Sequence, residues 1–252
     1  MKQTSEYYAY PETTTPQFHL ARHFIKECGF SEEESFLDIG CGDGRTTNFL
    51  ASLTPNRVVG IDRAEEMIHF ATRASSVYRH LEFIKADAEL FDLGQFDVVT
   101  CLFCANLIAD LDQMFFCIKK ALKQGGRVIM LIPAASNLFY ESNSKLLDNL
   151  SSTHKTKSRE IQDYQSAFLK FGLHPTMLKE EEISYQFDNQ ASFKAWLASR
   201  LDCLKILPEG EMEPFLSQAI GQYETYLIQK TYADVRNLFI FRLFKIILKA
   251  NT

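Results

Sequence analysis

A cluster of three glycines is the clearest chemical signal in this sequence. Gly40, Gly42 and Gly44 separate a β-rich run from a helical one, so they permit a tight turn and let a ligand approach the backbone closely. A dinucleotide fingerprint would read Gly-x-Gly-x-x-Gly, but Arg45 stands where its third glycine belongs. The spacing is therefore Gly-x-Gly-x-Gly, which indicates a ligand other than a pyrophosphate-bearing dinucleotide.

Acidic residues accompany this turn and follow the next two strands. Asp38 ends the first strand and Asp43 lies within the turn, where a carboxylate can hold an ammonium group. Asp62 follows the second strand, where an acid accepts hydrogen bonds from both ribose hydroxyls, and Asp87 follows the third, where it could accept from an adenine amino group. Taken singly, each would be a solvated loop residue or a helix cap. Together they fit S-adenosylmethionine, which carries a sulfonium and an ammonium group but no phosphate.

Alternating strands and helices must position these residues. The β-rich runs occupy 35–39, 57–61, 81–84, 96–100 and 127–131, and the helical patterns between them lie near 45–53, 64–74 and 111–123. Such alternation is typical of βαβ units around a parallel sheet, whose carboxyl edge binds ligands. The helix over 111–123 is expected to close at Gly125 and Gly126.

The remaining segments are expected to flank this core. A helix is predicted from Pro16 to Cys28, and the Ser-, Asn- and Lys-rich stretch 134–160 suggests a lid or surface insertion. Further helices are predicted at 159–171, 190–203 and 210–230, with extended runs at about 175–187 and 236–248. Aromatic residues make up 13% of the chain, and they either fill a core or line an apolar cavity.

The composition of the chain limits the binding partners and the cellular location that we expect. The net charge of −5, with scattered basic residues, argues against a nucleic acid as the principal partner. No signal peptide or membrane anchor is evident, so we expect a cytoplasmic protein with reduced thiols and no membrane partner. Cys101 and Cys104 form a Cys-x-x-Cys, but zinc would require a second ligand pair and a thioredoxin-like site would require an early strand before it. No metal is expected, and the oligomeric state cannot be read from the sequence.

On these motifs the chain resembles the class I S-adenosylmethionine-dependent methyltransferases over residues 35–132. The segment from Asp38 to Gly44, including Cys41, is similar to the family's cofactor motif, and the segments around Asp62 and Asp87 resemble its ribose- and adenine-binding segments. The resemblance implies a cofactor site formed by Asp38, Gly40, Cys41, Gly42, Asp43, Gly44, Asp62, Arg63, Met67, Asp87, Ala88, Leu102 and Phe103.

The resemblance also implies a fold and a division of the chain. We expect an α/β, Rossmann-like, doubly wound sheet of seven strands, the last antiparallel, with helices on both faces and a small lid or insertion. Residues 1–34 would form a helical cap, 35–133 the cofactor-binding core, and 134–252 the lid and the helices and strands that complete the same sheet. The whole would be a single domain.

Several phrases are similar to the group of juvenile hormone acid, trans-aconitate and malonyl-carrier-protein O-methyltransferases. They include Thr46-Thr47 after the turn, 102–107 after the fourth strand, and Phe193 with Trp196. Relatives commonly carry His-Trp where this chain has Asn106-Leu107. Asparagine cannot act as a base near neutral pH, whereas an ionised carboxylate acceptor needs none. This favours a small-molecule carboxylate oxygen, on an apolar acid or a carrier-bound acyl group, as the methyl acceptor.

Methyl transfer from a sulfonium is an in-line displacement in which positioning supplies most of the catalysis, so no catalytic residue is required. Candidates for the acceptor side are Gln17, Asn106, Tyr10, Phe103 and Tyr140, with Leu107 and Phe139 beside them, although each could equally serve packing. Three alternatives stay open. They are an N- or C-methyltransferase of a small metabolite, a non-catalytic S-adenosylmethionine-binding regulatory protein, and a nicotinamide-dependent oxidoreductase, which the glycine spacing disfavours.

Overall fold

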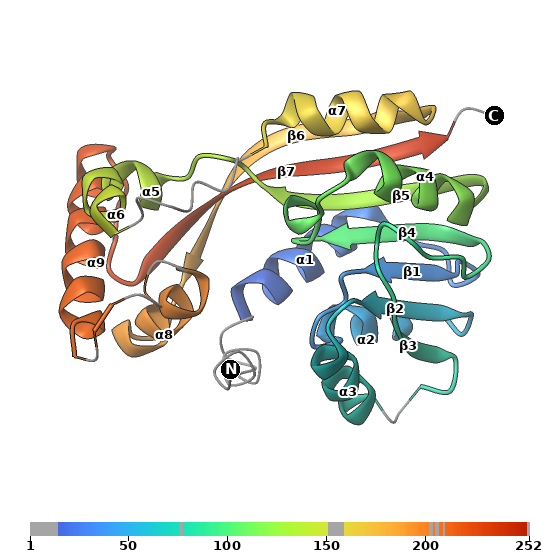
Figure 1. Cartoon of the computed structure of the whole chain (residues 1–252), viewed down its shortest axis with the longest axis horizontal. Coiled ribbons are helices and arrows are strands. Elements are labelled where there is room, and N and C mark those ends of the chain that lie inside the picture. Colours follow the sequence, from blue (N-terminus) through green and yellow to red (C-terminus); the bar gives the residue numbers. More distant parts are fainter. Residues whose placement is uncertain are drawn as a thin grey trace. The chain divides into compact units, whose positions relative to one another are not determined.

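The computed structural model describes residues 15–75, 78–150, 159–201, 204, 207–208 and 210–250. Its centre is a seven-stranded sheet in the order β3-β2-β1-β4-β5-β7-β6 (Figure 1). The first strands are β1 (Phe36–Ile39), β2 (Val58–Asp62), β3 (Leu81–Lys85), β4 (Phe96–Leu102) and β5 (Leu122–Pro133), each parallel to its neighbour among them. β1, β2 and β4 are almost wholly buried, which explains their nearly continuous apolar sequences.

The last strand reverses direction, as predicted. β7 (Leu238–Ala250) pairs antiparallel with β5, placing Leu131 opposite Lys245 and Val128 opposite Leu248. β6 (Leu173–Gln186) lies beyond β7 at the edge of the sheet. The prediction of a seven-stranded, doubly wound sheet with an antiparallel last strand is therefore confirmed.

The chain divides into two compact units, described here separately. The sheet unit comprises Gln17–Pro133, Arg159–Glu180 and Leu243–Thr252, as far as these are described, and the helical unit comprises the described parts of Met1–Pro16, Ala134–Ser158 and Glu181–Arg242. One boundary falls between Pro133 and Ala134, where the sequence suggested a change of character. β6 and β7 each contribute residues to both units.

Helices pack around the strands of the sheet unit. They are α1 (Thr15–Cys28), α2 (Arg45–Ala51), α3 (Glu65–Ala74), α4 (Leu111–Ala121) and α7 (Ile161–Lys170). α4 and α7 lie side by side, with the rings of Phe115 and Phe168 in edge contact 6.0 Å apart. α1 is fixed to β7 because the buried ammonium of Lys245 bonds Glu27 at 2.8 Å.

Two details of the sheet unit differ from expectation. α4 ends at Ala121, and β5 begins at Leu122, so the glycine pair does not close the helix. Gly125 has a positive φ of 79° inside the strand, at a register shift between the pairs Phe96–Leu122 and Val98–Arg127. Gly125 does adopt the left-handed conformation that was predicted. The prediction of a helix end was wrong, because an irregularity within a strand can require the same conformation.

The helical unit contains α5 (Leu138–Ser142), α6 (Ser144–Leu150), α8 (Gln190–Arg200) and α9 (Met212–Gln229), gathered near the ends of β6 and β7 (Figure 1). Part of the stretch 134–160, which was expected to be a lid or surface insertion, thus forms the helices α5 and α6. Asn137 begins α5 by accepting a hydrogen bond from the Tyr140 amide. These helices are short, and polar residues separate their apolar ones, so the sequence shows little helical periodicity there.

Aromatic side chains fill the core of the helical unit. Trp196 packs edge-on against Phe239 at 4.7 Å between ring centroids, and Phe193 stacks on Phe187 at 4.9 Å. Tyr223 is fully buried and its hydroxyl oxygen accepts a hydrogen bond from the Ile240 amide. The sequence left open whether the aromatic residues fill a core or line an apolar cavity. The residues named here fill a core.

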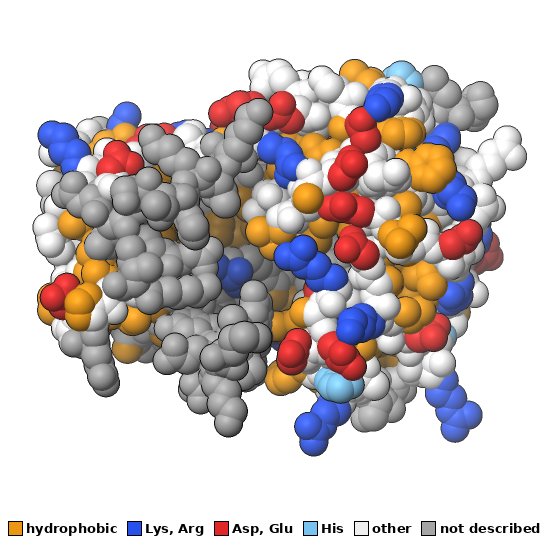
Figure 2. Space-filling model, viewed as in Figure 1, with side chains coloured by type: hydrophobic (Ala, Val, Ile, Leu, Met, Phe, Trp, Pro, Cys, Tyr) orange, Lys and Arg blue, Asp and Glu red, His pale blue; other side chains and the backbone are white. Residues whose placement is uncertain are grey.

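The visible surface of the sheet unit carries charges of both signs. Figure 2 shows acidic and basic side chains interspersed with apolar ones on this face, without a broad basic patch among the described residues. No helix in the described part of the chain is long and apolar enough to cross a lipid bilayer.

Candidate functional site

The glycine turn connects β1 to α2 and depends on left-handed backbone conformations. Gly40, Gly42 and Gly44 have φ values of 71°, 52° and 78°. A Cβ at Gly40 would lie 2.2 Å from Cys104 Sγ, and one at Gly44 would lie 2.7 Å from Ala71 Cβ. Glycine is therefore required twice over at both positions, by conformation and by space. Around Gly42 no atom would lie within 4 Å of a Cβ, so the turn is open there.

Asp62 ties the end of β2 to this turn. Its carboxylate accepts hydrogen bonds from the Gly42 amide at 3.1 Å and from the Ala64 amide at 2.9 Å, one on each oxygen. A carboxylate oxygen has a second lone pair, so both remain able to accept a hydroxyl. The half-buried Asp62 can thus shape the turn and still receive two ribose hydroxyls.

Asp38 lies at the end of β1 but does not face solvent. It is only 2% exposed, and its two oxygens accept hydrogen bonds of 2.7 Å from the hydroxyls of Thr47 and Thr100. Burial raises the pKa of Asp38 to about 6, although both threonine bonds oppose the shift. The residue therefore joins α2 to β4 through these two hydrogen bonds.

The threonines were missed as partners of Asp38. Thr100 is a hydroxyl within the apolar strand β4 and pairs in register with Asp38 on β1. A lone threonine at the position opposite a buried acid was the available signal. Thr47 was noted only as part of a phrase, and its burial on α2 gives it this role.

The other predicted ammonium ligand, Asp43, is bound to its own turn. Its oxygens accept from the Arg45 backbone amide at 3.2 Å and from Arg45 Nε at 3.0 Å. The Arg45 guanidinium also lies 5.4 Å above the ring of Phe18, which follows Gln17 on α1. The half-buried Gln17 consequently belongs to a helix that contacts the start of α2, directly after the glycine turn.

The predicted adenine side follows β3. Asp87 is exposed and accepts a hydrogen bond from the Glu89 amide at 2.9 Å, while Ala88 is buried. Met67 is half-buried on α3, and Arg63 is exposed just before that helix. Because β3, β2 and β1 are adjacent and parallel, the residues that follow them meet at one edge of the sheet (Figure 1).

The segment after β4 is unusual in its backbone. Phe103 has a φ of 60°, which is strained for a bulky side chain, while Leu102 before it is buried. Asn106 and Leu107 follow in a short 3-10 helix (Ala105–Leu107) and are exposed, Leu107 by 64%. Strain of this kind is common where a loop holds a ligand.

The remaining acceptor candidates are dispersed. Tyr140 is 48% exposed and belongs to the helical unit, near Phe139, which is buried in the aromatic core. Tyr10 lies outside the described residues. The described residues contain no group of three or more His, Cys, Asp or Glu side chains placed to hold a metal ion.

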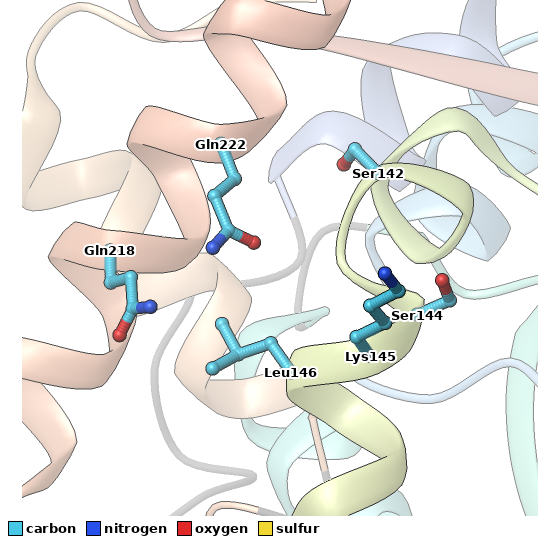
Figure 3. A pocket seen from close by; sticks show the side chains of 6 residues that line it. All are labelled: Ser142, Ser144, Lys145, Leu146, Gln218 and Gln222. Atoms are coloured by element: carbon cyan, nitrogen blue, oxygen red, sulfur yellow. The ribbon is translucent and has the colours of Figure 1, made fainter.

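The helical unit has a polar hollow of its own, with a volume of about 380 Å³. Figure 3 shows two glutamines of α9 directed toward the start of α6. The lining residues are Ser142, Ser144, Lys145, Leu146, Gln218 and Gln222. Its lining combines hydroxyl, amide and ammonium groups with apolar atoms but includes no aromatic residue, so it differs from the apolar cavity that the aromatic content suggested.

Comparison with known proteins agrees with this arrangement. Residues 37–130 match the model of a methyltransferase domain. The predicted methyltransferase 235L of Invertebrate iridescent virus 6 is 23% identical over 87% of this chain and 85% of its own length. The malonyl-[acyl-carrier protein] O-methyltransferase of Paenibacillus sp. strain JDR-2 is 25% identical over 70% of this chain and 65% of its own.

A solved structure of a predicted methyltransferase from Bacillus halodurans C-125 has the same fold. It superposes with a TM-score of 0.66 and 18% identity, covering 92% of this chain and 99% of the other. The match extends well beyond the glycine turn, so the later helices and strands also belong to this architecture.

Proposed function

We propose a methyl acceptor for this chain on the premise that it is a class I S-adenosylmethionine-dependent methyltransferase. The acceptor is a small molecule, and the atom that receives the methyl group is a carboxylate oxygen. The cofactor supplies a methyl group on a sulfonium, which a bound nucleophile can displace in line. The chain's own residues bind and orient the two reactants.

The cofactor residues are assigned by what each can donate or accept. Asp62 receives the two ribose hydroxyls on its free lone pairs, and Asp87 receives the adenine amino group. Met67 packs on the adenine. Gly42 leaves room for the backbone to approach the ligand, and the buried charge of Asp38 attracts its ammonium group. Arg63, Ala88, Leu102 and Phe103 complete the walls of the site.

One observation carries the choice of a carboxylate. The loop from Phe103 to Ala109 after β4 contains no His, Asp, Glu, Lys or Tyr, and Asn106 is its one amide side chain. An amide can hold an acceptor by a hydrogen bond but cannot remove a proton near neutral pH. An alcohol or ammonium would need that proton removed, whereas a carboxylate is already nucleophilic. The malonyl-carrier-protein relative supports the same choice.

The test is methylation of a panel of carboxylic acids, amines and phenols with radiolabelled S-adenosylmethionine. We expect the label in carboxylic acids, including thioester-bound acyl groups with a free carboxylate. A methyl ester releases methanol in mild alkali, whereas N- and C-methyl groups do not. Alkali-stable product would contradict the carboxylate proposal and would favour N- or C-methylation.

Cofactor affinity should depend on pH through Asp38. As pH falls through about 6 the buried carboxyl takes up a proton, and its attraction for the ligand ammonium is lost. We expect calorimetric affinity for S-adenosylhomocysteine, which retains the ammonium, to fall by up to about fourfold between about pH 7.5 and about pH 5.5, the most that one carboxyl with this pKa can cause. The Asp38→Asn variant should show a weak and nearly pH-independent affinity.

The same raised pKa makes Asp38 act on stability in the opposite direction. The folded state gains most from the protonated carboxyl below about pH 3.8, and that gain is lost as pH rises through about 6. Asp38→Asn should therefore not lower the unfolding temperature at neutral pH by more than the loss of one threonine bond would. An equal pH dependence of affinity in the wild type and the variant would contradict the role of this charge.

A further inference from the structure

Two thiols meet beside the glycine turn. Cys101 lies near the end of β4 and is fully buried, and Cys104 follows three residues later and is half-buried. Both are free cysteines, and Cys104 lies close enough to Cys101 to raise the pKa of its thiol. The strained residue Phe103 lies between them, with its φ of 60°. The left-handed conformation of Phe103 therefore turns the chain between the two cysteines.

Cys104 also touches the turn itself. Its sulfur would lie 2.2 Å from a Cβ at Gly40, so it fills the space that a side chain at that position would need. Any group added to this sulfur, or any displacement of it, changes the packing against Gly40. The site of oxidation and the proposed cofactor turn are in direct contact.

We propose that Cys104 and Cys101 form a thiol–disulfide switch that weakens cofactor binding when a low-molecular-weight disulfide oxidises them. The Cys104 thiolate attacks one sulfur of the small disulfide, and one thiolate leaves. Cys101 then loses its proton to solvent and attacks Cys104 Sγ, and the second small thiolate leaves. The two cysteines lose two electrons and two protons in total, and the small disulfide is reduced to two thiols.

The order of these steps follows from the surroundings of the two sulfurs. The neighbouring Cys104 thiol and burial together raise the pKa of Cys101 well above its usual range, so this thiol stays protonated in the reduced protein. Cys104 is the more accessible of the two and is the first nucleophile. Cys101 reacts only once an activated sulfur stands beside it.

The effect on the cofactor rests on the site proposed above. A disulfide requires a sulfur–sulfur distance of about 2.05 Å, shorter than any contact between two free thiols, so the two sulfurs must approach each other. Leu102 and Phe103, two of the proposed cofactor residues, lie between the cysteines and must change their torsions with it. The contact of Cys104 with Gly40 is altered at the same time.

The experiment treats the reduced, purified chain with oxidised glutathione, alkylates the remaining free thiols and maps peptides without reduction. We expect an intramolecular Cys101–Cys104 disulfide and at least about tenfold weaker calorimetric binding of S-adenosylhomocysteine, restored by a dithiol. Cys101→Ser should stop at a glutathione adduct on Cys104. Cys104→Ser should keep its affinity after the treatment.

Cys117→Ser is the matched control, because Cys117 is a buried thiol that donates to the Glu89 carbonyl, a bond that serine retains. This variant should respond to glutathione like the wild type. Absence of both adduct and disulfide, or a disulfide that leaves affinity unchanged, would overturn the proposal. A reduced protein that fails to bind S-adenosylhomocysteine would instead contradict the cofactor site and the effect on it, and peptide mapping would still decide whether the disulfide forms.

Discussion

Replacing Asp62 by alanine should weaken binding of S-adenosylmethionine about a hundredfold, because two hydrogen bonds to a charged acceptor together contribute about 3 kcal/mol or more. The same change removes the acceptor for the amides of Gly42 and Ala64, so the turn loses two internal bonds as well. We therefore expect a lower unfolding temperature in addition to weaker binding. Calorimetric titration and thermal unfolding measure the two effects separately.

Two further variants distinguish the role of this carboxylate from a general loss of acidity. Asp62→Asn keeps one acceptor oxygen and should bind with intermediate affinity. Glu65→Gln alters a nearby exposed acid at the start of α3, whose partner is Lys85, and should leave the dissociation constant unchanged. A dissociation constant for Asp62→Ala within about twofold of the wild type would falsify the ribose assignment.

Gly40→Ala should be among the most destabilising single changes in the chain. The new methyl would lie 2.2 Å from Cys104 Sγ and 2.5 Å from Cys104 Cβ, at a φ of 71°. Overpacking costs about 1–3 kcal/mol and a left-handed conformation about 1–2 kcal/mol more, so we expect the free energy of unfolding to fall by about 3 kcal/mol. Urea denaturation measures it.

Gly42→Ala supplies the matched comparison within the same turn. Its φ of 52° is also left-handed, but no atom lies within 4 Å of the new methyl, so only the conformational cost of about 1–2 kcal/mol applies. Adding Cys104→Gly to Gly40→Ala removes the clash and should recover part of the stability. Equal stabilities of Gly40→Ala and Gly42→Ala would show that contact with Cys104 does not matter.

The strands and the glycine turn could be predicted because their signals are local. A strand covered on both faces, such as β1 or β4, shows as a short apolar run, and a left-handed turn shows as glycine. The acids at the strand ends follow from the same order of elements. The order of the strands in the sequence was therefore enough to predict that Asp38, Asp62 and Asp87 lie at one edge of the sheet.

The parts that could not be predicted depend on contacts between distant residues. Asp38 was expected to meet the ligand, but Thr100, sixty-two residues away, and Thr47 occupy its oxygens. The thiol of Cys104 was judged only by its spacing from Cys101, and its contact with Gly40 arises from the fold. The aromatic residues allowed two readings, which only the packing of Trp196 against Phe239 could separate.

The residues on the acceptor side were the hardest to predict from the sequence, for the same reason. Gln17, Phe103 and Asn106 belong to the sheet unit, whereas Tyr140 belongs to the helical unit. Each was chosen from a local phrase, and no local pattern reports which side chains line one cavity. The proposed carboxylate acceptor therefore rests on the chemistry of the loop after β4 rather than on a predicted pocket.

The strand order also constrains how the chain can be made. β6 neighbours β7 in the sheet, yet residues 187–237 separate them along the chain. During synthesis on the ribosome, β6 emerges long before its partner exists, while the edge of β5 that β7 later covers is likewise open. Two strand edges thus stay unpaired until β7 has been synthesised, and unpaired edges promote association between nascent chains. A chain interrupted before Leu238 would carry both edges permanently and should depend on chaperones or aggregate.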